Sequence, residues 1–124
     1  MSVNPIGGLW TYPSTIFPQQ NDYMFIDVAR NRMITFVIMR EDPPWRPAIK
    51  HWYKPETDTT ITARLRPTEE WRTHEYDLQS NSLNWRYGGK VHEWRRVLWE
   101  QRPDWLEAEL AKANLKMDET EKNT

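Results

Sequence analysis

Cysteine is absent from the 124 residues of this chain. Its absence excludes disulfides, thiol nucleophiles and zinc or iron–sulfur centres held by cysteine. The sequence also lacks an apolar run of the roughly 20 residues that a membrane-spanning helix needs. Residues 1–9 do not have the basic and apolar regions of a signal peptide. We therefore expect a cytoplasmic protein with no membrane partner.

The chain also has no large excess of charge of either sign. It contains 17 Lys and Arg and 18 Asp and Glu, which gives a formal net charge of -1. Such a balance gives no overall attraction to nucleic acid. Arginines do alternate with aromatic residues between residues 64 and 96, a pattern that can bind single strands. Acidic residues lie among them, however, so ion pairs across a solvated sheet face explain the pattern better. We expect no nucleic-acid partner.

Glycine is scarce, with four residues, whereas aromatic residues are abundant, with eight Trp, five Tyr and three Phe. Aromatic side chains favour the pleated surface of a β-sheet and bury large areas. Hydrophobic residues make up 38% and charged residues 28%, which is typical of a folded chain rather than a disordered one. At this length we expect one domain over residues 1–118.

Alternating or apolar segments separated by turn residues predict about seven or eight antiparallel strands. The expected strands cover residues 7–12, 23–28, 33–39, 48–54 and 59–66, followed by three more between residues 71 and 98. Segment 23–39 is a hairpin that is apolar on both faces, so we expect cover on both sides. If the rest of the chain does not cover it, this hairpin favours a homodimer.

The pairing of the last three strands follows from two turns. A Gly88-Gly89 turn pairs Trp85 with His92, and a four-residue turn over residues 79–82 pairs Tyr76 with Trp85. Both turns place the same set on one face: His74, Tyr76, Leu78, Leu83, Trp85, Tyr87, His92, Trp94 and Leu98. Outside residues 71–98 the sequence does not determine the strand order.

A helix is expected over residues 104–117. Asp104 and Glu107 have the spacing of a capping box. An apolar stripe at helical spacing follows, made of Leu106, Leu110, Ala113 and Met117. The stripe is narrow, so we expect this helix to pack on the outside of the sheet, against hairpin 23–39. Residues 119–124 are expected to form a disordered tail.

The predicted fold class is therefore mostly β, an antiparallel up-and-down barrel with a C-terminal helix packed outside. Residues 7–99 resemble a lipocalin-like (calycin) domain of unknown function, through Gly8-Leu9-Trp10 on the first strand and an arginine near the last strand. The resemblance implies a ligand cavity inside the barrel. It also implies a basic side chain over Trp10, for which Arg95, Arg96 and Arg102 are the candidates.

The side chains predicted to face inward make up the candidate site. The predicted ligand-binding residues are Tyr53, Tyr76, Trp85, Tyr87 and Trp94, with His51, His74 and His92 as polar anchors. The aromatic residues form either a pocket wall or plain core. Three inward histidines could instead hold a catalytic metal, or could be ordinary buried groups with hydrogen-bond partners.

Non-catalytic binding of a small apolar or aromatic ligand is the function that these observations favour, without a cofactor. A homodimerisation or protein-interaction module and a histidine-based metal enzyme are the alternatives. No carboxylate pair or nucleophile motif is singled out by its spacing. The Pro- and Trp-rich segment 41–47 is either an interaction loop at the barrel rim or a stiff connector with Trp45 packed down.

Overall fold

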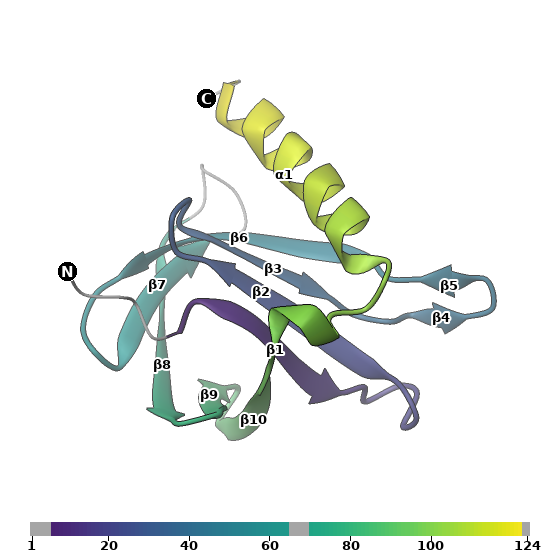
Figure 1. Cartoon of the computed structure of the whole chain (residues 1–124). Helices are drawn as coiled ribbons and strands as arrows, with labels where there is room; N and C mark the ends of the chain where they lie inside the picture. Colours follow the sequence, from purple (N-terminus) through teal and green to yellow (C-terminus); the bar gives the residue numbers. More distant parts are fainter. Residues whose placement is uncertain (1–5, 65–69, 123–124) are drawn as a thin grey trace.

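A closed antiparallel barrel dominates the computed structural model, which describes residues 6–64 and 70–122 (Figure 1). Within these residues the barrel strands are β1 (Gly8–Pro13), β2 (Asn21–Asp27), β3 (Arg32–Phe36), β6 (Ala48–Pro55), β7 (Thr60–Arg64), β8 (Arg72–Gln79), β9 (Ser82–Tyr87) and β10 (Lys90–Val97). Each strand pairs with the next barrel strand along the chain, and β1 pairs with β10 to close the ring. The predicted up-and-down barrel of about seven or eight strands is confirmed, and it has eight.

The predicted register of the last three strands is also confirmed. Tyr76 lies opposite Trp85, and Trp85 lies opposite His92. Gly88 and Gly89 form the turn between β9 and β10 with φ of 60° and 76°. A two-residue turn of this kind needs positive φ at both positions, which glycine adopts without strain.

A short hairpin replaces the loop expected over residues 41–47. It consists of β4 (Arg40–Glu41) and β5 (Pro44–Trp45) and projects from the barrel between β3 and β6 (Figure 1). Trp45 is 52% exposed, so it is not packed down as a connector would require. Strand β3 ends at Phe36, earlier than expected, and the backbone N–H of Ile38 donates instead to the buried carboxylate of Asp22 at 3.0 Å.

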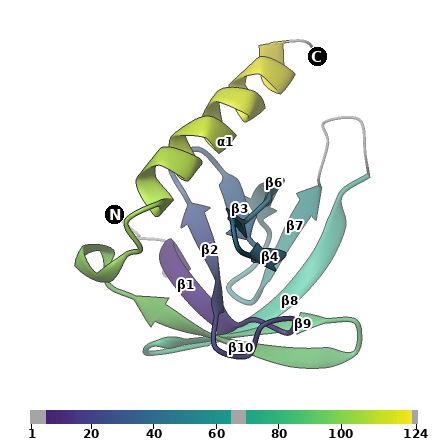
Figure 2. The ribbon, with the colours of Figure 1, turned by 90° about the vertical axis from the view of Figure 1, so that its right-hand side faces the viewer.

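Helix α1 (Leu106–Lys122) follows the short 3-10 helix η1 (Trp99–Gln101) and lies across the outside of the barrel (Figure 2). Its apolar stripe packs against outward-facing residues of the strands, and this second core is separate from the one inside the barrel. The outer core contains Leu9, Ile34, Phe36, Leu106, Leu110, Ala113 and Met117. The predicted docking on hairpin 23–39 is therefore confirmed, and the uncovered face that motivated a homodimer is covered by α1.

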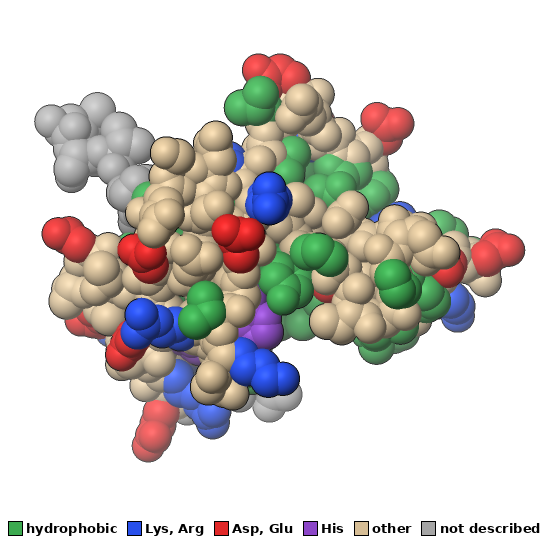
Figure 3. Space-filling model, turned by 90° about the horizontal axis from the view of Figure 1, so that it is seen from below, with side chains coloured by type: hydrophobic (Ala, Val, Ile, Leu, Met, Phe, Trp, Pro, Cys, Tyr) green, Lys and Arg blue, Asp and Glu red, His purple; other side chains and the backbone are tan. Residues whose placement is uncertain are grey.

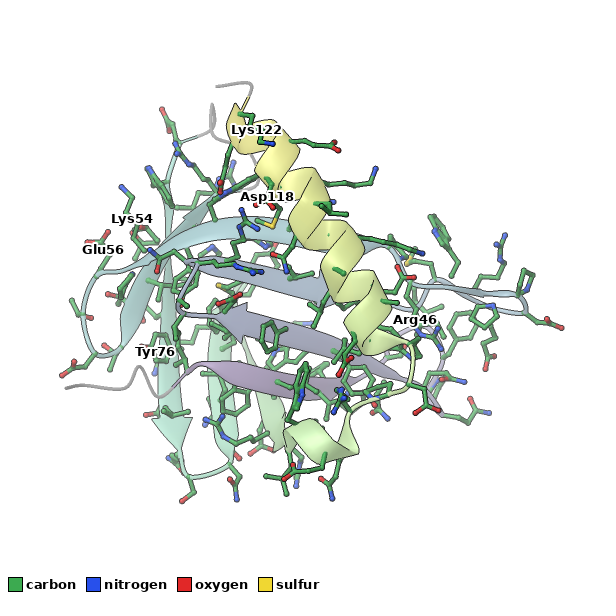
Figure 4. The ribbon with its side chains drawn as sticks, turned by 45° about the horizontal axis from the view of Figure 1, so that its top comes forward. Arg46, Lys54, Glu56, Tyr76, Asp118 and Lys122 are labelled. Carbon is green, nitrogen blue, oxygen red and sulfur yellow. The ribbon has the colours of Figure 1, made fainter. Side chains whose placement is uncertain are left out.

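The predicted end of the helix was wrong, because α1 continues through residues assigned to a disordered tail. Arg32, which is 4% exposed, donates to the Asp118 carboxylate at 2.6 Å and to Glu121 at 3.1 Å. It also donates to the Asn114 side chain at 2.8 Å. Figure 4 shows Asp118 on the side of α1 that faces the strands. These bonds hold the last turns against β3, while residues 123 and 124 lie outside the described part.

In the described part of the chain, no helix has both the length and the apolar character needed to cross a membrane.

Replacing Arg32 with Met should lower the free energy of unfolding by about 2 kcal/mol, because hydrogen bonds to charged groups contribute roughly 1.5–3 kcal/mol. Arg30→Met is the matched control. Arg30 is 57% exposed and lies 3.8 Å from Asp27, so its loss should change stability by less than about 0.5 kcal/mol. Urea denaturation of both variants measures the difference. Equal stabilities for the two variants would contradict a role for Arg32 in holding α1.

The stabilisation from Arg32 should also depend on pH. The hydrogen bond from Arg32 lowers the pKa of Asp118 below its usual 3.8. Hydrogen bonds from Trp52 and Arg32 lower the pKa of Glu121 below its usual 4.5. Because folding depresses both pKa values, the contribution is complete at neutral pH and is lost as the pH falls through the lowered values. The gap between wild type and Arg32→Met should therefore close in acid.

Candidate ligand-binding cavity

Large buried side chains pack together at one end of the barrel. Trp10 is fully buried there, and its indole N–H donates to the Ile6 carbonyl at 2.9 Å. The Arg96 guanidinium lies 4.2 Å from the centroid of the Trp10 ring and donates to the Gly7 carbonyl at 3.0 Å. Of the three candidate arginines, Arg96 is therefore the one that contacts Trp10. This end of the barrel is packed core, and neither Trp10 nor Arg96 lines the cavity at the other end.

The other end of the barrel contains a cavity of about 460 Å³. It is lined by Tyr12, Thr15, Met24, Met33, Thr35, Ile49, His51, Ala63, His74, Trp85, Tyr87, His92 and Trp94. The volume lies within the roughly 300–1,000 Å³ of pockets that bind small molecules. The barrel interior is therefore part core and part cavity.

The cavity brings together six of the eight predicted site residues. They are His51, His74, Trp85, Tyr87, His92 and Trp94. Tyr53 and Tyr76 also face inward but do not line the cavity, because they lie further toward the filled end, in the inner core. Strand alternation gave the correct face for both tyrosines, but it carries no information about height along the barrel axis.

Several lining residues were missed from the sequence although a signal for them existed. Ile49 and Ala63 sit on β6 and β7, whose inward face follows from alternation. Met24 and Met33 lie in hairpin 23–39, which is apolar on both faces, so alternation does not mark which of its side chains point inward. Tyr12 lies two residues after Trp10 and therefore on the same face of β1. For Thr15 and Thr35 the sequence gives no such signal, since Thr15 lies beyond the end of β1 and a threonine at position 35 does not mark the inside of β3.

Tyr12 links two aromatic residues of β10 across the barrel closure. Its hydroxyl and Nδ1 of His92 are 3.2 Å apart and share a hydrogen bond. The Tyr12 ring also meets the His92 ring edge-on at 5.5 Å and lies 5.2 Å from the Trp94 ring. These contacts fix the orientation of a polar pair in a wall whose other polar side chains include Thr15, Thr35, His51 and His74.

His74 lies on β8, two strands away from His92 around the barrel, beside aromatic rings of β9. Its ring centroid is 5.8 Å from that of Trp85 and 6.4 Å from that of Tyr87, with which it is stacked. Burial lowers the pKa of His74 below its usual 6.5, and the positive charge of Arg72 adds to this effect. Both effects favour the neutral form of His74, the form without a charge facing the cavity.

The three histidines do not form the metal site that the sequence left open. Among the described residues, which include all three, no group of three or more His, Asp or Glu side chains could hold a metal ion. His51, His74 and His92 lie on β6, β8 and β10, and each neighbours aromatic or apolar side chains around the same cavity. Their common feature is the cavity rather than a shared ion.

The cavity wall is uncharged and reaches the surface. No Lys, Arg, Asp or Glu is found among the described residues that line it. Because all three histidines of the chain line this cavity, the histidine side chains visible in Figure 3 mark a place where its wall meets solvent. Tyr87, at 66% exposed, lies on the rim. Such a wall suits an apolar or flat molecule better than a charged one.

Comparisons with known proteins return nothing that matches this chain, whether family models, curated proteins or solved structures. The closed eight-strand antiparallel barrel is itself consistent with a calycin-like fold.

Tyr53 allows a direct check on the filled end. Its side chain is 1% exposed, and its hydroxyl has no hydrogen-bond partner among the described residues. Burial raises the pKa of Tyr53 to about 12, with the nearby charge of Asp27 adding to the effect. Tyr53→Phe should therefore leave stability unchanged or raise it by up to about 1 kcal/mol, since no hydrogen bond is lost. Thermal and urea denaturation measure the change.

Tyr53→Ala is the contrasting variant, because it removes the ring and leaves a void. A loss of about 3–5 kcal/mol is expected for a large core residue. A marked loss in Tyr53→Phe would show that the hydroxyl has a partner, such as a buried water, and would contradict the assignment of Tyr53 to dry core.

Proposed function

We propose that this protein is a non-catalytic binder of a small apolar or aromatic molecule, held in the open end of the barrel. The observation that carries the proposal is the uncharged, aromatic-lined cavity of about 460 Å³. Burial of apolar ligand surface there contributes roughly 25 cal/mol per Å². Aromatic walls add favourable stacking for a flat ligand.

Polar groups in the wall give the ligand an orientation. Tyr12 and His92 share a hydrogen bond at 3.2 Å, and burial favours the neutral form of His74. Neutral imidazole and phenol groups each donate and accept hydrogen bonds. A ligand with one hydroxyl, carbonyl or amine group on an apolar body matches this wall.

Resemblance to lipocalin-like domains supports the same function. The resemblance rests on Gly8-Leu9-Trp10, and Arg96 packs over Trp10 as that resemblance implied. A relationship to the lipocalin-like domains would place the ligand inside the barrel, where the cavity lies. The proposal itself depends on the cavity and not on the relationship, because fold alone does not determine function.

Titration with N-phenylnaphthylamine tests the proposal. This uncharged aromatic amine becomes more fluorescent in apolar surroundings. Wild-type protein should bind it saturably with one site per chain and a Kd of about 1–10 μM, corresponding to roughly 7–8 kcal/mol. Failure of the folded protein to bind this probe and a panel of uncharged aromatic molecules of similar size would contradict the proposal.

A variant that fills the cavity tests whether the probe binds inside the barrel. Thr35 lines the cavity and is half-buried, so Thr35→Trp should place an indole in the ligand space and weaken binding about tenfold or more. Thr73→Trp is the matched control, since it makes the same change at an exposed position on the outer face of β8. Circular dichroism checks that both variants fold. Equal binding by the two variants would place the probe outside the barrel.

Binding should weaken in acid. Folding depresses the pKa of His74 below 6.5, and an apolar ligand disfavours its charged form further. Affinity should therefore be constant above pH 7 and fall as the pH drops below 6.5. His74→Asn should reduce this fall, and this variant keeps His51 and His92, which line the same cavity. Affinity that is flat from pH 7.5 to 5 in wild type would contradict the placement of the ligand beside His74.

A further inference from the structure

A groove of about 320 Å³ lies outside the barrel, between the β4–β5 hairpin and helix α1. One side is formed by residues 44–48, which end the hairpin and begin β6, and the other by α1 and the preceding Trp105. Figure 4 shows Arg46 beside the first turns of α1, at the boundary of the two sides. The groove shares no lining residue with the barrel cavity.

Positive charge is concentrated in this groove. Its lining contains Arg46, Lys50, Lys112 and Lys116 but only one acid, Glu109, which accepts a hydrogen bond from Lys112 at 3.1 Å. Within the described part of the chain, Arg46, Lys50 and Lys116 form no ion pair with a carboxylate. The whole protein has a net charge of -1. A cationic groove on such a protein attracts anions locally.

Two tryptophans make the groove aromatic as well as cationic. The Arg46 guanidinium lies 4.4 Å from the centroid of the Trp105 ring, a cation–π contact that fixes its position. The Trp105 ring also packs edge-on against Phe36 at 5.5 Å, which anchors it to the outer core. Trp45 is 52% exposed at the rim. Exposed indole next to fixed guanidinium suits a ligand with both a flat ring and a negative charge.

Small and stiff residues keep the groove open. Ala48 and Ala113 line it from β6 and α1, and larger side chains at these positions would occupy the space. Pro44 and Pro47 lie on either side of Trp45 and Arg46 in the wall of the groove. Proline restricts the backbone to a narrow range of φ, so this part of the wall is stiff. The side chains of Lys112 and Lys116 lie one helical turn apart and so project from the same face of α1.

We infer that this groove binds a small organic phosphate that carries a planar ring, with a mononucleotide as the representative chemistry. A phosphate monoester has a charge of about -1.5 to -2 at neutral pH and three acceptor oxygens, so it can be shared among several of these cations. A carboxylate carries a single negative charge, so it would neutralise less of the positive charge of the groove than a phosphate monoester does. The ring would stack on Trp45, since stacking of a base on an aromatic side chain contributes about 1–3 kcal/mol.

Calorimetric titration of the full chain at low ionic strength tests this inference. The probes are adenosine monophosphate, adenosine and inorganic phosphate. Adenosine monophosphate should bind at one site per chain, and adenosine and inorganic phosphate should each bind about tenfold or more weakly, because each lacks one of the two interactions. Affinity should fall as salt is added. Absence of binding, or equal binding of all three probes, would overturn the inference.

Charge reversal on the same helix locates the site. Lys116→Glu should weaken binding of adenosine monophosphate about tenfold or more, whereas Lys122→Glu, which makes the same change in net charge outside the groove, should alter it less than about twofold. Trp45→Ala should reduce the affinity for adenosine monophosphate but not for inorganic phosphate. Equal losses in the two lysine variants would indicate general electrostatic attraction and overturn the assignment.

Two further measurements distinguish this site from the barrel cavity and a small organic phosphate from an acidic protein partner. Thr35→Trp, which fills the barrel cavity, should leave binding of adenosine monophosphate unchanged, so either site can fail its test without the other. An acidic peptide of six glutamates should bind more weakly than adenosine monophosphate, because it has no planar ring. Tighter binding of the peptide would overturn the inference in favour of a protein partner.

Discussion

Pairing of β1 with β10 is the contact on which the rest of the structure depends. It opposes Trp10 and Arg96, residues 86 positions apart, and converts a meander with two free edges into a closed ring. Closure gives every strand an inside and an outside, and it limits the interior to what the side chains of eight strands can fill. Trp10 and its neighbours fill one end, and the smaller Thr35 and Ala63 are part of the wall where space remains.

Strand β6 shows how closure allows two unlike environments to lie a few ångströms apart. Ile49 and His51 point into the barrel and line the uncharged cavity, whereas Ala48 and Lys50 point out and line the cationic groove. Trp52, the residue after His51, packs against the outer core, and its indole N–H donates to Glu121 at 2.7 Å. Alternation along one strand therefore keeps the uncharged cavity and the cationic groove on opposite sides of the same wall.

Local patterns in the sequence were sufficient for the barrel, the register of β8 to β10 and the inward face of the candidate residues. Gly88-Gly89 and the alternation around Trp85 carry that information within a few residues. Local patterns do not give the position of an inward side chain along the barrel axis, because that position depends on the stagger between strands that are distant in sequence. For this reason Tyr53 and Tyr76 were placed in the site although they belong to the core.

Long-range pairing also explains the wrong prediction for the end of α1 and the absence of the groove from the sequence-based expectations. The end of α1 is held by Arg32, which lies 86 residues before Asp118, and no helical pattern within 104–124 contains that partner. The groove combines residues from the hairpin, from β6 and from α1, each unremarkable in its own segment. Trp45 was recognised as belonging to an unusual segment, but its neighbours Lys112 and Lys116 could be assigned to it only by the docking of the helix.

The docking of α1 also has a consequence for biosynthesis. Ile34 and Phe36 are fully or almost fully buried in the finished protein, in part by residues 106–122. A ribosome adds roughly 5–20 residues per second and releases the N-terminal part first, so hairpin 23–39 leaves the exit tunnel several seconds before its cover exists. During that interval the growing chain presents an apolar, β-forming surface to its surroundings and to any chaperone that meets it.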